Sequence, residues 1–436
     1  MSDERKIPEG RLGRFARLAA MGVRTGAGML LERDGASSAS HAAEVLGTLR
    51  GLAAKVGQMA SYVDGVVPEA HRDAYEASMK ALRASAPRSS SAQIRAAVEE
   101  ELGAPVDRLF ASFSDEPLAS ASIGQVHAAT LPDGREVAVK VQHPGIVKAV
   151  ESDLANAGML EGFAGALGGK RFDTKRMFEV IRERFREELD YELEATRLSH
   201  FARLHAGDPT VRVPALVQSH TTKRVLTTAL ARGLSFDEAC AAPEGDRLAW
   251  ATTMWRFVFK GTLVGAMLNA DPHPGNYVFH AGGRVTFLDY GCVQTMDEDR
   301  RARARRVHFA ALARDEREFA AAVKAMVASK PGPLEELAVA YTRRCFEPLF
   351  ASPYRISKAY AASLVDGMKE MGQRARKVKE AELFTMPPDM LFVNRLQFGF
   401  YSVLARLDVE ADYASVERAF LEAERGHAAA PALTAG

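Results

Sequence analysis

Cysteine is scarce in this sequence. Its 436 residues include three cysteines, Cys240, Cys292 and Cys345, which stand far apart and form no CxxC pair. This spacing argues against a disulfide framework and against a thiolate zinc site. We therefore expect free thiols that pack as small apolar side chains in a reducing compartment.

Excess charge and long apolar runs are also missing. The net charge of +1 gives no general attraction to nucleic acid, so we expect no nucleic-acid partner. No apolar run approaches the ~18 residues that span a bilayer, and the charged first fifteen residues lack the apolar core of a signal peptide. These absences predict a cytoplasmic protein whose only membrane contact is peripheral.

Strand patterns occupy the middle of the chain. Two β-rich runs flank Pro132-Asp133-Gly134, a tight turn in which proline presets φ and glycine accepts positive φ. The predicted strands are residues 109–113, 126–131 and 136–142, followed by a further pair at 211–217 and 223–230.

Helical patterns lie on both sides of the strands. The predicted helical stretches are 11–33, 41–83, 92–103, 173–205, and most of 234–425 apart from a loop and hairpin region at 271–288. The stretch 11–33 alternates apolar residues with arginines, a pattern that fits either a membrane-surface helix or a helix packed on its own protein.

The most informative segment is Asp271-Pro-His-Pro-Gly-Asn276 followed by Leu288-Asp289-Tyr290-Gly291. Asn276 lies five residues after Asp271, the interval found in the catalytic loop of kinases, and Asp289 stands where a D-F-G aspartate binds Mg²⁺. Carboxylate and amide oxygens are the ligands that magnesium prefers. We therefore predict a metal site at Asn276 and Asp289 with Asp271 as a catalytic residue. Either fragment alone would read as a turn or a strand end.

Two upstream segments complete a nucleotide site. Val137-Ala138-Val139-Lys140 ends in a strand-borne lysine that can reach the nucleotide phosphates when a helix glutamate holds it. The segment between the first two strands takes the place of a glycine-rich loop but is rich in alanine, which stiffens it. The predicted ATP-binding residues are Ala119, Ser120, Ala121, Ser122, Gly124, Gln125 and Lys140.

Together these motifs resemble the UbiB/AarF, or ADCK-like, family of atypical protein kinases. The match rests on Ser-Ile-Gly-Gln-Val-His at 122–127, on Lys55-Val-Gly-Gln58 as the K-x-G-Q motif, and on Glu188-Leu-Asp190 as the E-x-D motif. It covers residues 45–295 and implies an α+β, bilobal protein-kinase-like fold with a small β-rich N-lobe, a helical C-lobe and an N-terminal helical extension.

The order of helical and strand-rich segments also predicts domain bounds. The expected parts are an extension at 1–103, an N-lobe at 104–232, a C-lobe at 233–427 and a disordered tail at 428–436.

The resemblance further implies residue roles. Glu194 would pair with Lys140 as a catalytic partner, and Lys55 and Gln58 would fold over the site as regulatory residues, with Lys55 near Glu188 and Asp190. On a single helix, Asp190 and Glu194 would share a face and Glu188 would point elsewhere. A charged solvent face is the alternative that the residues alone leave open.

The family is regarded as ATP- and Mg²⁺-dependent, ATPase-like, and tied to isoprenoid quinone metabolism. This implies an ATPase or a small-molecule or lipid-linked phosphotransferase, with isoprenoid lipid as a partner. The one Ala-Pro-Glu sequence, at 242–244, precedes Asp271, so it cannot close an activation segment, which argues against ordinary peptide phosphorylation. A nucleotide-gated scaffold or chaperone with little catalysis, and a phosphotransferase of the antibiotic-kinase type, are the alternatives.

Overall fold

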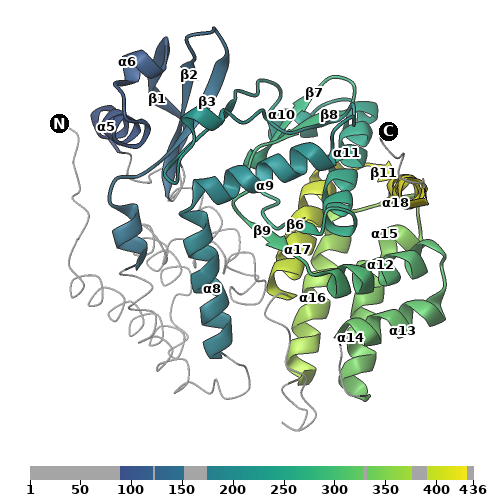
Figure 1. Ribbon diagram of the computed structural model, residues 1–436. Coiled ribbons are helices and arrows are strands. Elements are labelled where there is room, and N and C mark those ends of the chain that lie inside the picture. Colours follow the sequence, from purple (N-terminus) through teal and green to yellow (C-terminus); the bar gives the residue numbers. More distant parts are fainter. Residues whose placement is uncertain (1–88, 121–122, 152–173, 328–330, 376–389, 430–436) are drawn as a thin grey trace, which may run out of the picture. The chain divides into compact units, whose positions relative to one another are not determined.

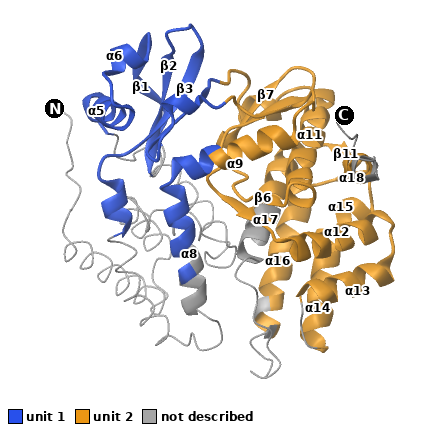
Figure 2. Ribbon diagram, viewed as in Figure 1, with its two compact units in different colours: residues 1–195, 216–230 blue, residues 196–215, 231–436 orange. Residues whose placement is uncertain are grey.

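The chain combines strands and helices in an α+β fold. The computed structural model describes residues 89–120, 123–151, 174–327, 331–375 and 390–429 (Figure 1). These residues form two compact units (Figure 2): unit 1 contains those up to Ala195 together with Leu216–Leu230, and unit 2 contains the rest. The helices predicted at 11–33 and 41–83, with Lys55 and Gln58, lie outside the described residues.

Unit 1 is built on an antiparallel sheet in the order β1-β2-β3-β5. Its strands are β1 (Ser112–Ser120), β2 (Gly124–Thr130), β3 (Glu136–Gln142) and β5 (Val225–Ala229). The predicted turn joins β2 to β3, with Gly134 at φ +85° and its N–H donating to Leu131 O at 2.9 Å. The helix α5 (Ser91–Leu102) begins at a capping box on Ser90 and buries Ile94 and Val98 in the core that contains the odd-numbered valines of β3.

The first and fourth predicted strands differ from the prediction. Residues 106–109 form the short helix α6 (Val106–Leu109), so β1 starts three residues later than expected. Of the stretch 211–217, only β4 (Val211–Arg212) is a strand, and it pairs with β8 in unit 2 instead of β5. Pro214 has no N–H to donate to a ladder, and a single bridge, Leu216 to Thr228, remains of the predicted pairing.

The predicted helix at 173–205 is two helices, α8 (Thr174–Glu188) and α9 (Tyr191–Leu204). The break comes at Asp190, whose carboxylate accepts from the backbone N–H groups of Glu192 and Leu193, each at 3.1 Å. A carboxylate in that position satisfies N–H groups that a helix start leaves open. The argument that placed Asp190 and Glu194 on one helix face is therefore wrong.

In unit 2 a long buried helix supports short strands. The elements are α10 (Phe236–Cys240), α11 (Glu244–Leu263), β6 (Met267–Asn269), the 3₁₀ turn η4 (Pro274–Asn276), β7 (Tyr277–His280), β8 (Arg284–Phe287) and β9 (Val293–Thr295). The β7–β8 hairpin matches the predicted one and turns at Gly282 and Gly283, with φ of +73° and +71°. It lies in the sheet β4-β8-β7, and β6 pairs with β9.

The remainder of unit 2 is helical, as predicted. It contains α12 (Glu298–Leu312), α13 (Glu316–Val327), α14 (Pro333–Cys345), α15 (Glu347–Phe350), α16 (Lys358–Ala375), α17 (Met390–Leu407) and α18 (Tyr413–Ala429), with β10 (Tyr354–Arg355) paired to β11 (Glu410–Ala411). Helix α18 runs two residues into the tail predicted to be disordered. The three cysteines are free thiols, and no described helix is long and apolar enough to cross a membrane.

A buried carboxylate ties three of these helices together. Glu417 of α18 is fully buried and accepts from Trp255 Nε1 of α11 at 3.0 Å and pairs with His308 Nδ1 of α12 at 2.8 Å. Removing an acceptor from buried donors leaves them unsatisfied, which costs roughly 1–3 kcal/mol.

We therefore expect Glu417→Ala to lower the free energy of unfolding by about that amount, measured by urea denaturation. Glu422, exposed on the same helix, supplies the control Glu422→Ala. Equal stability of the two variants would contradict this account.

Candidate functional site

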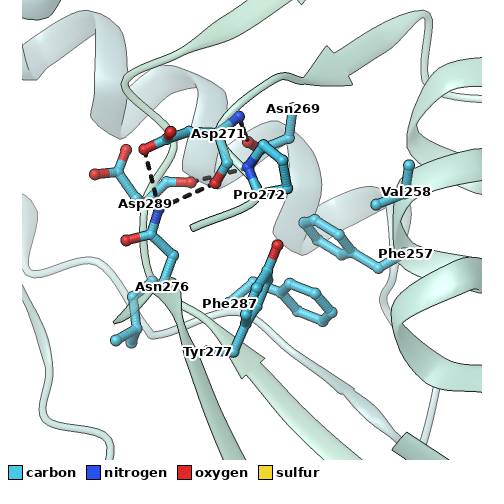
Figure 3. A pocket seen from close by; sticks show the side chains of 10 residues that line it. Phe257, Val258, Asn269, Asp271, Pro272, Asn276, Tyr277, Phe287 and Asp289 are labelled. Carbon is cyan, nitrogen blue, oxygen red and sulfur yellow. Dashed lines mark hydrogen bonds between the residues drawn. The ribbon is translucent and has the colours of Figure 1, made fainter. Parts of the chain in front are cut away.

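A pocket in unit 2 gathers the polar residues that the sequence singled out. It is lined by Asp271, Asn276 and Asp289, together with Asn269 and an apolar set: Phe257, Val258, Pro272, Tyr277, Phe287 and Leu288. Figure 3 shows the polar side chains converging on one side while the rings of Phe257, Tyr277 and Phe287 lie on the other. The predicted residues Asp271, Asn276 and Asp289 are thus brought together.

Short strands position these side chains. Strand β6 ends at Asn269, two residues before Asp271, and β8 ends at Phe287, two residues before Asp289. The two loops are joined by backbone hydrogen bonds from Ala270 N to Cys292 O at 2.8 Å and from Leu288 N to Asn276 O at 3.0 Å. The loops are therefore held in a fixed position relative to each other.

Asn276 is oriented by Asp271. Its Nδ2 donates to Asp271 O and to Asp271 Oδ2, both at 3.1 Å. Because the amide hydrogens are used in this way, the Oδ1 atom of Asn276 is the group left to serve as a ligand. Asp289 keeps its place through Gly291 N, which donates to Asp289 Oδ1 at 2.8 Å.

Asn269 links the two aspartates. Its Nδ2 donates to Asp289 O at 2.9 Å, and its Oδ1 accepts from Asp271 N at 3.2 Å. Sequence reasoning missed this residue, although a side-chain amide that can donate and accept, two residues before Asp271, is a signal that could have found it.

An aromatic layer supports the loops. Tyr290 is fully buried, packs 5.3 Å from Phe201 and donates its hydroxyl to Phe287 O at 3.0 Å. The rings of Phe257 and Phe287 stack with centroids 3.6 Å apart. Tyr290 therefore anchors the loop that carries Asp289 in this aromatic layer.

His205 lies against this layer. Its ring stacks on Phe257 at 5.1 Å, and neither ring nitrogen has a hydrogen-bond partner among the described residues. Burial, reinforced by the charge of Lys260, lowers the pKa of His205 from 6.5 to about 3. The folded protein therefore holds this imidazole neutral.

In unit 1 the predicted lysine and glutamate form an ion pair. Lys140 Nζ lies 2.9 Å from Glu194 Oε1 and 2.8 Å from Oε2, and Glu194 is buried. The register pairs Val126 with Lys140 and Ala128 with Ala138, so Lys140 lies on the sheet face opposite the α5 core. A buried carboxylate holds the ammonium group in place.

Tyr191 is a second residue that sequence reasoning missed. It is fully buried, and Lys140 Nζ lies 4.9 Å from the centroid of its ring. A side chain on Gly124 would come within 2.9 Å of the Tyr191 hydroxyl and would clash with Val141 O. Gly124 is therefore needed in β2 for its small size, which allows the ring to support Lys140.

The predicted phosphate-binding segment is described only in part. Ala119 and Ser120 end β1, paired with Val126 and Gln125, while Ala121 and Ser122 lie outside the described residues. The Gln125 side chain is buried and accepts from Ser89 N at 3.1 Å. Any contact of Gln125 with a nucleotide would therefore be made by its backbone.

The residues predicted to be regulatory are only partly described. Glu188 ends α8 and Asp190 caps α9. The predicted partners of both, Lys55 and Gln58, lie outside the described residues, so this grouping stays a prediction.

The oxygen set in unit 2 suits magnesium. No group of three or more His, Cys, Asp or Glu side chains among the described residues could enclose a metal. Mg²⁺ is commonly held by one or two carboxylates plus substrate phosphates instead of an all-protein cage. Asp289 with Asn276 Oδ1 fits that ligand pattern.

Comparisons with known proteins show which proteins this chain resembles. The model of the ABC1 atypical kinase-like domain matches residues 81–323. The chain is 32% identical over 311 residues to the rat protein named atypical kinase COQ8B, mitochondrial, covering 66% of this chain and 58% of that protein. It is 33% identical over 276 residues to the Marinobacter nauticus protein named probable protein kinase UbiB, covering 61% and 49%.

A solved structure shares the fold. A Mycobacterium tuberculosis protein solved in complex with erythromycin aligns with a TM-score of 0.59 at 22% identity, covering 92% of this chain and 97% of that one.

The chain spans about half the length of the curated relatives it matches.

The link made by Asn269 can be tested without any ligand. We expect Asn269→Ala to free the backbone of Asp271 and Asp289, so amide hydrogen exchange in residues 270–277 and 288–292 should accelerate. Asn269→Asp keeps an acceptor for Asp271 N but loses the donor to Asp289 O, so only the second segment should accelerate strongly. Unchanged exchange in both variants would refute the link.

The buried, neutral His205 should make the folded protein less stable in acid. Below about pH 6.5 the unfolded chain binds a proton that the folded protein excludes until about pH 3, so stability falls as pH drops through this window. Between pH 7 and 5 this amounts to about 2 kcal/mol. Urea denaturation of His205→Phe should show a decline that is shallower by that amount; parallel profiles for the two proteins would count against it.

Proposed function

Because the chain belongs to the ABC1 atypical kinase-like family, we propose that it binds Mg-ATP and acts as an ATPase or as a phosphotransferase on a small or lipid-linked acceptor. The observation that carries the proposal is the pocket of unit 2, where Asp271, Asn276 and Asp289 are held together by amide and backbone hydrogen bonds. Two carboxylates and one amide oxygen on one pocket are the kind of oxygen ligands that a magnesium ion binds.

Each residue has a distinct task in this proposal. Asp289 and Asn276 Oδ1 would hold Mg²⁺, which when bound neutralises charge on the phosphates. Asp271, held by the Asn276 amide, would orient the attacking hydroxyl or water and accept its proton as the bond to the γ-phosphorus forms and the β–γ bridge breaks. Lys140, held by Glu194, would bind the α- and β-phosphates.

Unit 1 offers a surface for the base. Val126, Ala128 and Ala138 lie beside Lys140 on one sheet face, and each is half-buried. Small apolar side chains on a flat sheet can pack against a purine ring, since ligand sites are mostly apolar with few polar groups.

One observation favours the alternative of a nucleotide-gated scaffold with little turnover. Ala119 and Ser120 are held in the β1 ladder and are not part of a free glycine-rich loop. A stiffer segment over the phosphates would adapt less to a transition state.

The proposal for the acceptor rests on the family alone. The resemblance links such proteins to isoprenoid quinone metabolism, and we propose an acceptor or ligand of that lipid class, reached by peripheral contact with a membrane.

The metal role of Asp289 gives the test of the proposal. In the wild type, Mg²⁺ together with ATP should raise the melting temperature, and phosphate should be released. Asp289→Asn removes a negative ligand, so both the Mg²⁺-dependent part of the shift and the release should be lost. Thermal shift and phosphate release, each with and without Mg²⁺, measure this.

The matched control is Asp246→Asn, an exposed aspartate in the first turn of α11. It should behave as wild type. Nucleotide binding without phosphate release in the wild type would favour the scaffold. An Mg²⁺ response that Asp289→Asn retains would overturn the proposed metal site.

A further inference from the structure

Helix α17 is fixed in unit 2 by aromatic packing. Phe400 and Tyr401 are buried and lie 6.1 and 6.0 Å from Trp255 of α11. The Tyr401 hydroxyl donates to Cys345 O of α14 at 3.0 Å. These contacts hold this part of the helix by groups that belong to neither pocket loop.

The residue next to this anchor, Gly399, touches the pocket. A β-carbon built on Gly399 would lie 2.5 Å from Pro272 Cγ, 3.6 Å from Cδ and 3.7 Å from Cβ. Carbon atoms pack at about 3.5–4.0 Å, so the first contact is impossible without a shift. All three nearest atoms belong to Pro272, so the missing side chain makes room for this ring.

Pro272 is tied closely to the backbone of its neighbours. It follows Asp271 directly, and its ring fixes φ. On its two sides, Asp271 N donates to Asn269 Oδ1 at 3.2 Å and His273 N donates to Asp271 O at 2.7 Å. Figure 3 shows Pro272 beside Asp271 and Asn269. A push on the ring is therefore passed to the Asp271 backbone and, through its hydrogen bonds, to Asn276.

Helix interiors disfavour glycine by about 0.5–1 kcal/mol relative to alanine. A glycine there calls for a packing reason, and Pro272 supplies it. The contrast is Gly245, the second residue of α11, where an added β-carbon would meet nothing within 4 Å.

We infer that Gly399 is a positioning residue for the Asp271 loop: by lacking a side chain, it lets α17 set where Asp271 and Asn276 lie. This inference rests on the proposed function. Helix α17 lies outside the segment 81–323 that matches the family model, so the C-terminal part of this chain would contribute to the geometry of the site.

The experiment compares four full-length proteins: wild type, Gly399→Ala, Gly245→Ala and the double variant Gly399→Ala/Pro272→Ala. Displacing the loop should weaken Mg-ATP binding and slow turnover on the order of 10- to 100-fold in Gly399→Ala, since small misplacements of a catalytic group have effects of this size. Gly245→Ala should bind and turn over as wild type. In the double variant, loss of the Pro272 ring carbon Cγ should restore part of the binding.

A structural readout needs no nucleotide. Amide exchange of residues 270–277 should accelerate in Gly399→Ala, stay at the wild-type rate in Gly245→Ala and slow again in the double variant. Should Gly399→Ala be too unstable to study, Pro272→Ala alone serves instead, and its exchange at 398–400 should then change because the same contact is lost.

The outcomes separate the two proposals. If the wild type shows no Mg-dependent nucleotide binding, the proposed function falls, while the exchange data still decide whether Gly399 positions the loop. If the wild type binds and Gly399→Ala matches Gly245→Ala in affinity, turnover and exchange, the inference is overturned. The inference is also overturned if Gly399→Ala loses affinity and the double variant Gly399→Ala/Pro272→Ala does not regain part of it. The lost affinity would then come from general destabilisation and not from the contact with Pro272.

Discussion

The pocket of unit 2 places two carboxylates close together, and like charges in a partly buried site repel. The structure meets this constraint with amides. Asn276 donates to the carboxylate of Asp271, and Asn269 bridges the backbones of Asp271 and Asp289. An amide can donate and accept at once, so one side chain can hold two groups of the loops in place. The surrounding fold serves to keep these short loops in a fixed position relative to each other.

That fixed position depends on packing from several directions. Strands β6 and β8 deliver the two loops, and Phe257, Phe287 and Tyr290 form the apolar layer beneath them. Close-packed interiors transmit small displacements, so a change at α17 or α11 can be felt at Asp271. Gly399 and His205, neither of which lines the pocket, belong to this support.

Unit 1 must hold a positive charge, that of Lys140, in a fixed position. Lys140 carries its charge on a sheet face and is held by the buried carboxylate of Glu194 and by the ring of Tyr191. The helix that brings Glu194 and Tyr191 there starts at the Asp190 cap. A residue expected to regulate the site is thus also needed to begin the helix. A substitution at Asp190 would therefore disturb the Lys140–Glu194 pair even if its predicted contact with Lys55 did not exist.

The sequence by itself determined the local features whose causes lie within a few residues. The β2–β3 turn follows from Pro132 and Gly134, the hairpin from Gly282 and Gly283, and the Asp271-to-Asn276 loop and Asp289 from a spacing that fits metal chemistry. The family motif also pointed to the pairing of Lys140 with Glu194.

Tertiary structure alone decided the rest. That Asn269 bridges two loops, that Tyr191 supports Lys140 and that Gly399 makes room for Pro272 all depend on residues far apart in the chain. The helix break at Asp190 and the parallel pairing of β4 with β8 were missed for related reasons. A side-chain cap and a distant strand outweighed local periodicity, because hydrogen-bond satisfaction and packing are settled only when the chain is folded.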